Sequence, residues 1–560
     1  MQLGYSAIGR KDYLSIFKVV FTKAHCLKMN YLKSILLSLI FLASHSSQLL
    51  AQTSTKAKQP NIVFIISDDH AFQAIGAYGG KLMPTPNIDR IAKEGAIFQN
   101  SFVTNSICGP SRATLLTGKY SHQNGYTLNE KKFDVNQFLF SRLLQENNYQ
   151  TAWVGKWHLG NLPQGFDYFN ILRGQGNYYN PDFISSNKDT IKQNGYVTNI
   201  ITDKSLDWLN TRDPNKPFCL VIGEKATHRE WIPDLPDLGV YDEIDFPIPS
   251  NFFDTYEGRE AAMHQDMTVE KTMRMNEDVK VHMDYITGDF KRLNDEQRAV
   301  LKKYYDGVTK EFDEKKLSGK ELSKWKFQRY MKDYLAVAKS MDRNIGKILD
   351  YLDKNNLVEN TVLVYVSDQG FYLGEHGWFD KRFMYEESLK TPFLIRYPTL
   401  IKPGTHITRF ASNIDWAPTI LDLAQVKIPA EVQGVSLVPV LKNNQVKQWK
   451  DELYYHYYEY PEPHHVSPHF GIRTPQYKLI RFYNAKTTWE FYDLKKDPSE
   501  IKNSIHDKNY QSTITNLKTK LAILIDKYQD KEAKAILEKE ISSQKISSKK
   551  TSSINTFSKK

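Results

Sequence analysis

Four stretches of this chain share one pattern, in which an unbroken run of apolar residues stops at a cluster of polar ones. The apolar runs cover residues 61–67, 151–155, 218–223 and 361–367. Strands that are apolar throughout, rather than at every second residue, are typical of a parallel sheet with both faces covered. Helical spacing of apolar residues separates these runs, for example from Tyr334 to Leu352. The pattern predicts an α/β fold with a mostly parallel sheet flanked by helices.

The polar clusters that end these runs should meet in space, because ligands of open α/β sheets bind beyond the carboxyl ends of the strands. The clusters are Asp68-Asp69-His70, Lys156-Trp157-His158, Glu224-Lys225-Ala226-Thr227-His228 and Asp368-Gln369-Gly370. We therefore expect all four at one edge of the sheet.

Two of these strand ends are acidic. Asp68, Asp69 and Asp368 offer carboxylates, and Gln369 offers an amide oxygen. One adjacent Asp pair is more often a turn or a helix cap. Two acidic strand ends in one α/β domain favour a hard-cation site, with Ca²⁺ before Mg²⁺.

The other two strand ends are cationic, with Lys156 and His158 in one and Lys225 and His228 in the other. Lys381 adds a further cation after the last strand. A lone histidine is usually a core or surface residue, but this set is consistent with an anion site. Fixed cations stabilise charge that spreads over oxygens in a transition state, and histidine donates protons near neutral pH.

Cys108 stands in the run from Ser106 to Gly118, SICGPSRATLLTG. Pro110 suits the first turn of a helix, so Cys108 would lie at a helix N-terminus with Arg112 one turn further on. Both features favour an anion there. The alternative for a bare C-x-P is a buried cysteine beside a turn.

The run from Cys108 to Gly118 resembles the signature of the type I sulfatases, C-x-P-S-R followed by a helix that ends in T-G. The resemblance covers roughly residues 58–505 and includes Thr85–Arg90 and Tyr492–Pro498. The stretch 370–397 looks most similar to the iduronate and glucosamine sulfatase branches. The resemblance as a whole implies a bacterial, polysaccharide- or glycosaminoglycan-directed sulfatase with an alkaline-phosphatase-like fold.

The resemblance also implies a cofactor and a cation site. Cys108 would be oxidised to formylglycine by a maturation enzyme, and its hydrate would attack the sulfate ester. The cation site would comprise Asp68, Asp69, Cys108, Asp368 and Gln369. The family commonly has Asn where this chain has Gln369, which offers the same donor chemistry.

On this interpretation each cationic residue has a role. Arg112 and Lys156 would stabilise the hydrated nucleophile, and Lys225 and Lys381 would bind sulfate oxygens. His228 would protonate the departing sugar oxygen, and His158 would help to release sulfate and restore the aldehyde. The family usually has A-P-H where this chain has Ala226-Thr227-His228, which puts the geometry of that loop in question but not the role of His228.

The domain boundaries are read from composition. Residues 58–440 form the predicted catalytic domain, in which the charged stretch from about 230 to 330 is an insertion of loops and helices. Short strand-like runs from 441 to 535 predict a smaller α+β subdomain with an antiparallel sheet. Residues 536–560 are rich in Lys and Ser and are predicted to be disordered.

One loop of the second subdomain could reach over the site and bind the substrate. It carries His464, His465, His469 and Arg473. A solvated hairpin loop is an equally good interpretation of the same residues.

The N-terminus resembles a secretory signal. Lys33 precedes an apolar run from Ile35 to Ala43, and small and polar residues follow to about residue 52. The run is too short to span a membrane, and Met29 would be a more ordinary start. We therefore expect residues 1–51 to be removed, without a transmembrane anchor, and the protein to be periplasmic or secreted.

Charge and cysteine content narrow the choice of partner. Residues 1–51 carry +5, residues 541–560 carry +5 and the whole chain +11, so about +1 remains for the body. A nucleic-acid partner would need a basic stripe on the folded body, so none is expected. The three cysteines, Cys26, Cys108 and Cys219, predict no disulfide framework.

The favoured function is hydrolysis of sulfate esters on a glycan, such as the algal polysaccharide ulvan or a glycosaminoglycan, in polysaccharide degradation. One alternative is a phosphoester or phosphonate hydrolase of the same superfold, which would use the same cation and nucleophile. The other is a non-catalytic binder of sulfated glycans, against which the intact Cys108–Arg112 run argues.

Overall fold

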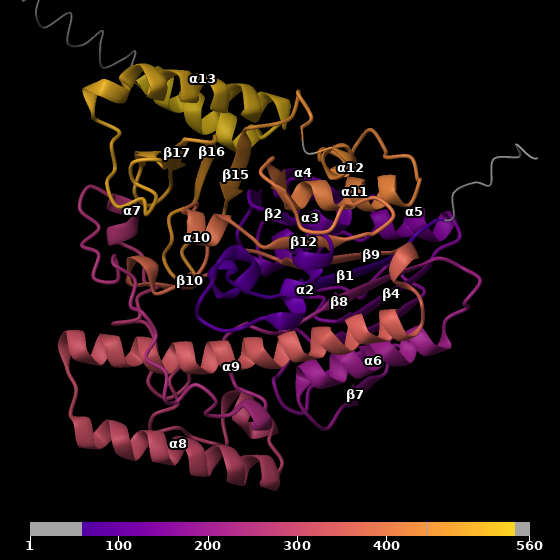
Figure 1. Cartoon of the computed structure of the whole chain (residues 1–560). Helices are drawn as coiled ribbons and strands as arrows, with labels where there is room; N and C mark the ends of the chain where they lie inside the picture. Colours follow the sequence, from indigo (N-terminus) through magenta and orange to yellow (C-terminus); the bar gives the residue numbers. More distant parts are fainter. Residues whose placement is uncertain (1–58, 444, 544–560) are drawn as a thin grey trace, which may run out of the picture. The chain divides into compact units, whose positions relative to one another are not determined.

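A ten-stranded sheet lies at the centre of the protein in a computed structural model that describes residues 59–443 and 445–543 (Figure 1). Its strand order is β13-β2-β12-β9-β1-β8-β4-β5-β6-β7. The strands are β1 (Asn61–Ser67), β2 (Ala96–Phe98), β4 (Gln150–Gly155), β5 (Tyr168–Leu172), β6 (Asp182–Ser185), β7 (Thr190–Lys192), β8 (Phe218–Gly223), β9 (Thr361–Ser367), β12 (Phe393–Arg396) and β13 (Thr405–Ile407).

The four apolar runs of the sequence are the adjacent strands β9, β1, β8 and β4. Each is parallel to its neighbour, with Ile65 of β1 in register with Ile222 of β8 and Tyr365 of β9. Antiparallel strands occur only towards the two sides of the sheet, at β12 and at β6 and β7. The predicted mixed, mostly parallel sheet is confirmed, and the four polar clusters follow the same edge.

Helices cover both faces of the sheet. Val63 and Ile65 of β1 belong to one buried core, whereas Ile62, Phe64 and Ile66 belong to another on the opposite face. The first core is closed by α2 (Pro86–Glu94), α6 (Val197–Thr211) and α9 (Gly319–Lys354). The second is closed by α3 (Cys108–Thr117), α5 (Phe140–Glu146), α11 (Trp416–Leu423) and α12 (Val438–Lys442). Burial on both faces explains why these strands are apolar throughout.

The insertion from 230 to 330 contains helices and loops and no named strand. Its main helix, α8 (Asp295–Lys315), begins at a capping box in which Asn294 and Gln297 exchange hydrogen bonds. α9 is longer than the expected Tyr334–Leu352, because its first turns leave the sheet and pack beside α8 (Figure 1). Shorter helices are α4 (Ser121–Asn124), α7 (Glu260–Met263) and α10 (Glu386–Leu389).

A four-stranded antiparallel sheet forms the C-terminal subdomain, as predicted. Its strands are β15 (Leu453–Tyr457), β16 (His469–Arg473), β17 (Tyr477–Phe482) and β18 (Thr488–Asp493), and α13 (Gln511–Lys527) packs against it. The expectation that His469 and Arg473 lie on a loop is wrong, because they begin and end β16. Two two-stranded sheets complete the described fold: β3 (Ser101–Phe102) pairs with β14 (Ala411–Ser412), and β10 (Tyr372–Leu373) pairs with β11 (Phe379–Asp380).

The chain continues as a helix over residues 531–543. This corrects the predicted disorder for residues 536–543, which contain one lysine, Lys539, together with Leu537, Ile541 and other residues that a helix can accommodate. The remainder of that predicted tail, residues 544–560, lies outside the described residues, as do the predicted signal peptide and Cys26.

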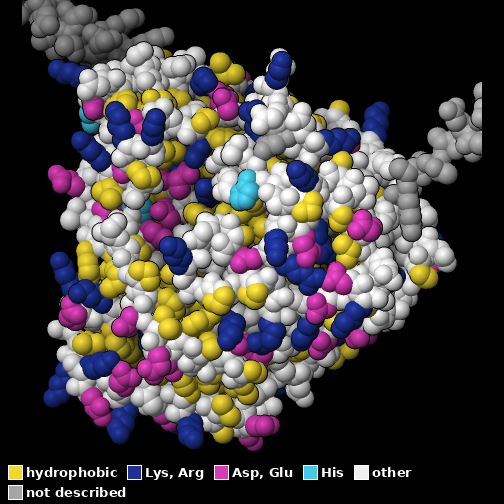
Figure 2. All heavy atoms as spheres, viewed as in Figure 1, with side chains coloured by type: hydrophobic (Ala, Val, Ile, Leu, Met, Phe, Trp, Pro, Cys, Tyr) yellow, Lys and Arg dark blue, Asp and Glu magenta, His cyan; other side chains and the backbone are white. Residues whose placement is uncertain are grey.

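Among the described residues no helix is both long and apolar enough to cross a membrane. On the face shown in Figure 2, Lys and Arg side chains are interspersed with Asp and Glu. Cys108 and Cys219 are both buried and are not joined to each other.

Candidate active site

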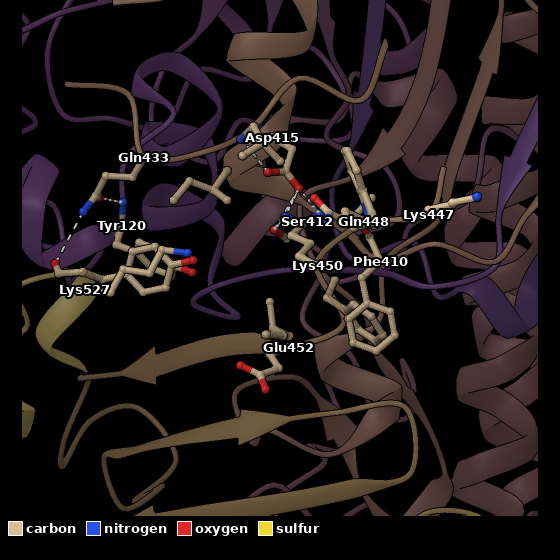
Figure 3. A pocket seen from close by; sticks show the side chains of 17 residues that line it. Tyr120, Phe410, Ser412, Asp415, Gln433, Lys447, Gln448, Lys450, Glu452 and Lys527 are labelled. Atoms are coloured by element: carbon tan, nitrogen blue, oxygen red, sulfur yellow. Dashed lines mark hydrogen bonds and ion pairs between the residues drawn. The ribbon is translucent and has the colours of Figure 1, made fainter. Parts of the chain in front are cut away.

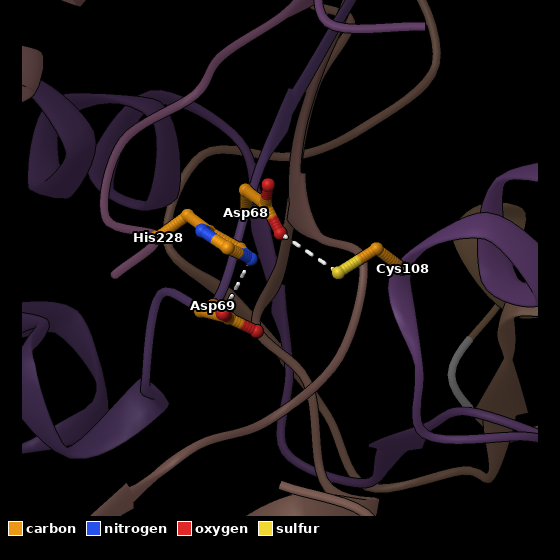
Figure 4. Close-up of side chains that lie close together, drawn as sticks. All are labelled: Asp68, Asp69, Cys108 and His228. Carbon is orange, nitrogen blue, oxygen red and sulfur yellow. Dashed lines mark hydrogen bonds and ion pairs between the residues drawn. The ribbon is translucent and has the colours of Figure 1, made fainter. Parts of the chain in front are cut away.

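The ends of the central strands bring Asp68, Asp69, Cys108 and His228 together (Figure 4). One ligand atom from each lies within 4.8 Å of the others. Both aspartates follow β1, His228 follows β8, and Cys108 begins α3 on the covering layer. Residues that are up to 160 positions apart in the chain thus form one buried cluster, as the edge-of-sheet argument predicts.

Cys108 is the first residue of α3, which ends at Gly118 in the left-handed conformation with φ of 61°. The Cys108 side chain is 1% exposed, and its thiol donates to Asp68 Oδ1 at 3.2 Å. Burial raises the pKa of this thiol to about 12, and the negative charges of Asp368 and Asp69 contribute to the rise. The unmodified thiol is therefore protonated and is a poor nucleophile at neutral pH.

Each aspartate of the pair is bound by a lysine from another segment. The Lys156 ammonium donates to Asp68 Oδ2 and also to the side-chain oxygen of Gln175. Lys381 Nζ donates to Asp69 Oδ2 at 2.7 Å. The site is therefore a dense array of paired buried charges, and removing one partner would leave the other uncompensated.

Asp368 and Gln369 face the same cluster from β9. Arg112 donates through Nε to Asp368 Oδ2 at 3.0 Å and through Nη1 to the Lys156 carbonyl at 2.9 Å. Gln369 Nε2 donates to Asp69 Oδ1 at 2.5 Å and lies 3.5 Å from Cys108 Sγ. These contacts place the acidic strand ends and the nucleophile helix around one point.

The two predicted histidines are half-buried beside the lysines. His228 Nδ1 bonds the Arg229 carbonyl at 2.7 Å, which leaves Nε2 facing Asp69 Oδ2 at 4.0 Å. Burial, and then the charges of Lys156 and neighbouring cations, hold the pKa of both His228 and His158 well below the usual range. Both imidazoles are neutral in the ligand-free site.

Lys225 lies in the same loop after β8 as His228, and its ammonium lies 4.8 Å from the centre of the Tyr178 ring. Burial lowers the pKa of Lys225 and is opposed by nearby carboxylates, beginning with Asp289. A desolvated lysine of this kind gains strongly from an anionic ligand.

The donor set fits a hard cation. Asp68, Asp69 and Asp368 supply carboxylate oxygens, and Gln369 Oε1 is a buried acceptor without a hydrogen-bond partner. An unsatisfied buried acceptor beside three carboxylates is what a Ca²⁺ or Mg²⁺ ligand set requires.

The four predicted residues of the second subdomain have different positions. His464 lies beside the site, because its Nε2 bonds Asp380 Oδ2 at 3.0 Å and Asp380 adjoins Lys381. His465 is exposed and pairs with Asp266 at 3.3 Å. This loop therefore reaches the site through Asp380.

His469 and Arg473, which were predicted to contact the substrate, are both buried and bonded to other groups of the protein. His469 is fully buried, with Nδ1 bonded to the Ser467 carbonyl and Nε2 accepting from the Met384 amide. Arg473 donates to both oxygens of Glu386 and lies over the ring of Phe102 at 4.8 Å. Strand formation by residues 469–473 turned both side chains into the subdomain interior.

Sequence reasoning missed several residues that support the site. Gln175 bonds Lys156, and the Tyr334 and Thr227 hydroxyls bond the Asp69 carbonyl. Thr227 occupies the very position at which the chain departs from A-P-H. Periodicity marked the helix containing Tyr334 but could not show which side chain would reach the strand end.

A separate cavity of about 590 Å³ lies between the C-terminal subdomain and the small β3–β14 sheet (Figure 3). Its wall includes Phe410, Trp449 and Lys527, and Asp415 in it is paired with Lys450. The four residues of the acidic cluster and its lysines do not line this cavity.

Family models agree with this geometry. The model described as Sulfatase matches residues 60–426, and that described as N-sulphoglucosamine sulphohydrolase, C-terminal, matches residues 374–527.

Individual relatives point the same way. The chain is 46% identical over 492 residues to an N-acetylglucosamine-6-O-sulfatase of Bacteroides thetaiotaomicron, covering 85% of this chain and 88% of the relative. It is 25% identical over 494 residues to an ulvan-active sulfatase of Formosa agariphila, covering 85% and 83%. A solved structure in complex with its substrate, D-glucosamine-2-N,6-O-disulfate, superposes with a TM-score of 0.83 at 46% identity and covers 85% of this chain and 99% of that one.

A more distant neighbour shares the fold alone. The phosphonate monoester hydrolase of Agrobacterium radiobacter superposes with a TM-score of 0.62 at 18% identity, covering 84% of this chain and 96% of that one.

Proposed function

The chain belongs to the sulfatase family and is a sulfuric ester hydrolase acting on sulfated glycans, and we propose that its substrate is the 6-O-sulfate ester of a glucosamine residue. The relative that is 46% identical is an N-acetylglucosamine-6-O-sulfatase, and both chains are covered almost throughout. This similarity favours a glucosamine of the glycosaminoglycan type over ulvan, for which the relative is only 25% identical.

The observation that carries the proposal is the convergence of Cys108 with two aspartates and His228 at the sheet edge. Oxidation of Cys108 to formylglycine would supply the attacking oxygen, and a cation held by Asp68, Asp69, Asp368 and Gln369 would supply fixed positive charge. Ca²⁺ is favoured over Mg²⁺ because four protein oxygen donors converge here, whereas Mg²⁺ usually keeps several waters and binds only one or two carboxylates.

The chain's own side chains supply binding and proton transfer. Lys225 and Lys381 bind the sulfate oxygens, and Arg112 and Lys156 stabilise the nucleophile, because all four are buried cations around the thiol. Fixed cations in a water-poor site stabilise transition-state charge strongly.

Two histidines handle protons in this proposal. His228 gives a proton from Nε2 to the departing sugar oxygen after it has been protonated at that nitrogen with substrate bound, and the Arg229 carbonyl holds the ring through Nδ1. His158 assists the release of sulfate. His464 contacts the sugar beside Asp380, to which it is bonded.

Sulfate release from a panel of 6-O-, 3-O- and 2-O-sulfated sugars tests the substrate. We expect the highest kcat/KM for glucosamine carrying 6-O-sulfate, with either an N-sulfate or an N-acetyl group. A higher value for the galactosamine isomer or for ulvan fragments would contradict the proposal.

Two comparisons separate the alternative functions. An aryl phosphate or phosphonate turned over faster than the matching aryl sulfate would favour the phosphoester hydrolase. Glycan binding without sulfate release by the correctly matured protein would favour a binder.

We also propose that the protein acts outside the cytoplasm, in the periplasm or as a secreted enzyme, after removal of residues 1–51. N-terminal sequencing of the protein from its native host would test this, and a retained N-terminus would contradict it.

A further inference from the structure

We propose that Tyr334 of α9 is a positioning residue for the cation site: its hydroxyl clamps the turn from Asp69 to Ala71 that presents the Asp69 carboxylate. The inference rests on the proposed cation site. It means that helix α9, which packs on one face of the sheet, helps to hold the cation ligands in place.

The turn needs an external clamp because Asp69 has left-handed backbone geometry, with φ of 63°. This conformation is unfavourable for a residue other than glycine, because the Cβ atom comes too close to the following carbonyl oxygen. Asp can offset the cost by bonding its own backbone, but both carboxylate oxygens of Asp69 are committed to Gln369 and Lys381. Contacts with other segments must therefore hold the backbone.

The Tyr334 hydroxyl supplies two of these contacts. It donates to the Asp69 carbonyl at 2.8 Å and accepts from the Ala71 amide at 2.9 Å. One oxygen thus joins residues two apart in the chain and closes the turn. The Thr227 hydroxyl donates to the same Asp69 carbonyl at 2.9 Å, which ties the turn to the loop that carries Lys225 and His228.

The Tyr334 ring reaches the second ligand-bearing loop. It stacks on Phe371 with ring centres 5.8 Å apart and an angle of 13° between the planes. Phe371 is 1% exposed and follows Gln369 by two residues. A single side chain of α9 therefore contacts the segments that follow both β1 and β9.

Removal of the hydroxyl alone should loosen the turn without opening a cavity. In Tyr334→Phe the ring stack is kept, whereas the buried Ala71 amide loses its partner and the Asp69 carbonyl keeps only Thr227. Loss of an outer partner of a metal ligand typically weakens metal binding by about 10- to 100-fold.

Tyr179→Phe is the matched control. Tyr179 is 2% exposed, and its hydroxyl donates to the Pro233 carbonyl at 2.8 Å. It is a buried tyrosine bonded to backbone, like Tyr334, but its partner is not next to a ligand. The control therefore reports the general cost of deleting such a hydroxyl.

Calcium titration calorimetry of the full-length protein tests the inference. We expect the Kd for Ca²⁺ to rise at least tenfold in Tyr334→Phe and to stay within twofold of the native value in Tyr179→Phe. Equal affinity in the native protein and Tyr334→Phe, or equal weakening in both variants, would overturn the assignment.

Amide exchange in the cation-free protein gives a second readout that does not depend on the proposed function. The Ala71 amide should exchange faster in Tyr334→Phe than in the native protein or Tyr179→Phe, and unchanged exchange would overturn the clamp. Failure of the native protein to bind Ca²⁺ or Mg²⁺ would instead count against the proposed cation site, while the exchange experiment still decides the role of Tyr334.

Discussion

Nε2 of His228 faces the Oδ2 of Asp69 at 4.0 Å, while Nδ1 of the same ring bonds the carbonyl of Arg229. The second bond fixes the ring and assigns the N–H to Nδ1 in the neutral form. Nε2 is thereby left as the nitrogen that gains and loses a proton at the cluster. Surrounding lysines hold the pKa of His228 low until an anionic substrate enters.

His228→Gln should slow sugar sulfates far more than aryl sulfates. A sugar alkoxide needs a proton to leave, whereas a nitrophenolate does not, and general acid catalysis contributes about 10²- to 10⁴-fold. We expect kcat on the sugar sulfate to fall in this range and kcat on nitrophenyl sulfate to fall less than tenfold. The exposed His282→Gln is the control. Equal losses on both substrates would assign His228 another role.

Cys108→Ala should abolish turnover but keep the fold, because the buried thiol makes only weak hydrogen bonds, to Asp68 and from Gln369. Cys219→Ala is the comparison, since this second buried thiol lies within the apolar β8 strand. We expect sulfate release to be lost only in the first variant. Mass spectrometry of the native peptide should show the thiol replaced by an aldehyde, and an intact thiol in active enzyme would refute the mechanism.

Removal of divalent cations should inactivate and destabilise the protein together. Asp68, Asp69 and Asp368 are buried carboxylates that a bound cation would neutralise. A ligand at 100 times its Kd stabilises the folded state by about 2.7 kcal/mol. We expect chelation to lower the melting temperature and sulfate release, and Ca²⁺ to restore both better than Mg²⁺. An unchanged melting temperature after complete chelation would argue against the site.

Acid should destabilise the C-terminal subdomain through His469. Burial lowers the pKa of His469 to about 3, and the unfolded value is about 6.5. The unfolded state thus binds the proton first, so stability is full above about pH 6.5 and falls as the pH drops towards 3. This amounts to about 2 kcal/mol between pH 6.5 and 5.

His469→Gln should flatten that dependence of unfolding free energy on pH, measured by denaturant titration. Some slope should remain, because burial also lowers the pKa of His70 to about 3. An unchanged slope in the variant would show that His469 does not contribute. Sulfate release at neutral pH should be near native in the folded variant, since His469 lies inside β16.

Arg473→Gln should also separate stability from substrate binding. Arg473 pairs with Glu386 and lies over Phe102, so we expect a lower melting temperature and an unchanged KM. A raised KM without loss of stability would restore its predicted substrate contact.

The sheet and the nucleophile helix were predictable because their signals are local. β1, β8, β4 and β9 are apolar throughout, and Pro110 and Gly118 mark the first turn and the end of α3. The convergence of Asp68 and His228 followed from strand direction, whereas the place of Cys108 in the site followed from the resemblance to the sulfatase signature.

The second subdomain was harder to predict from the sequence, because its buried strand β16 contains charged and small residues. The sequence of β16, which contains His469, Gly471 and Arg473, is typical of a polar loop. Its burial follows only from the contacts that His469 makes with Met384 and Arg473 makes with Glu386. Those partners lie more than 80 residues earlier in the chain, so no local pattern reveals them. The same holds for Tyr334, whose role depends on a carbonyl 265 positions away.

The enclosure of Cys108 also orders the events of biogenesis. A side chain that is 1% exposed gives a second protein no route to its sulfur once α3 has docked on the sheet. Any enzyme that oxidises it would have to meet the chain while the segment around Pro110 is still extended. Protein that folds before Cys108 is oxidised would then have the native fold but no sulfatase activity.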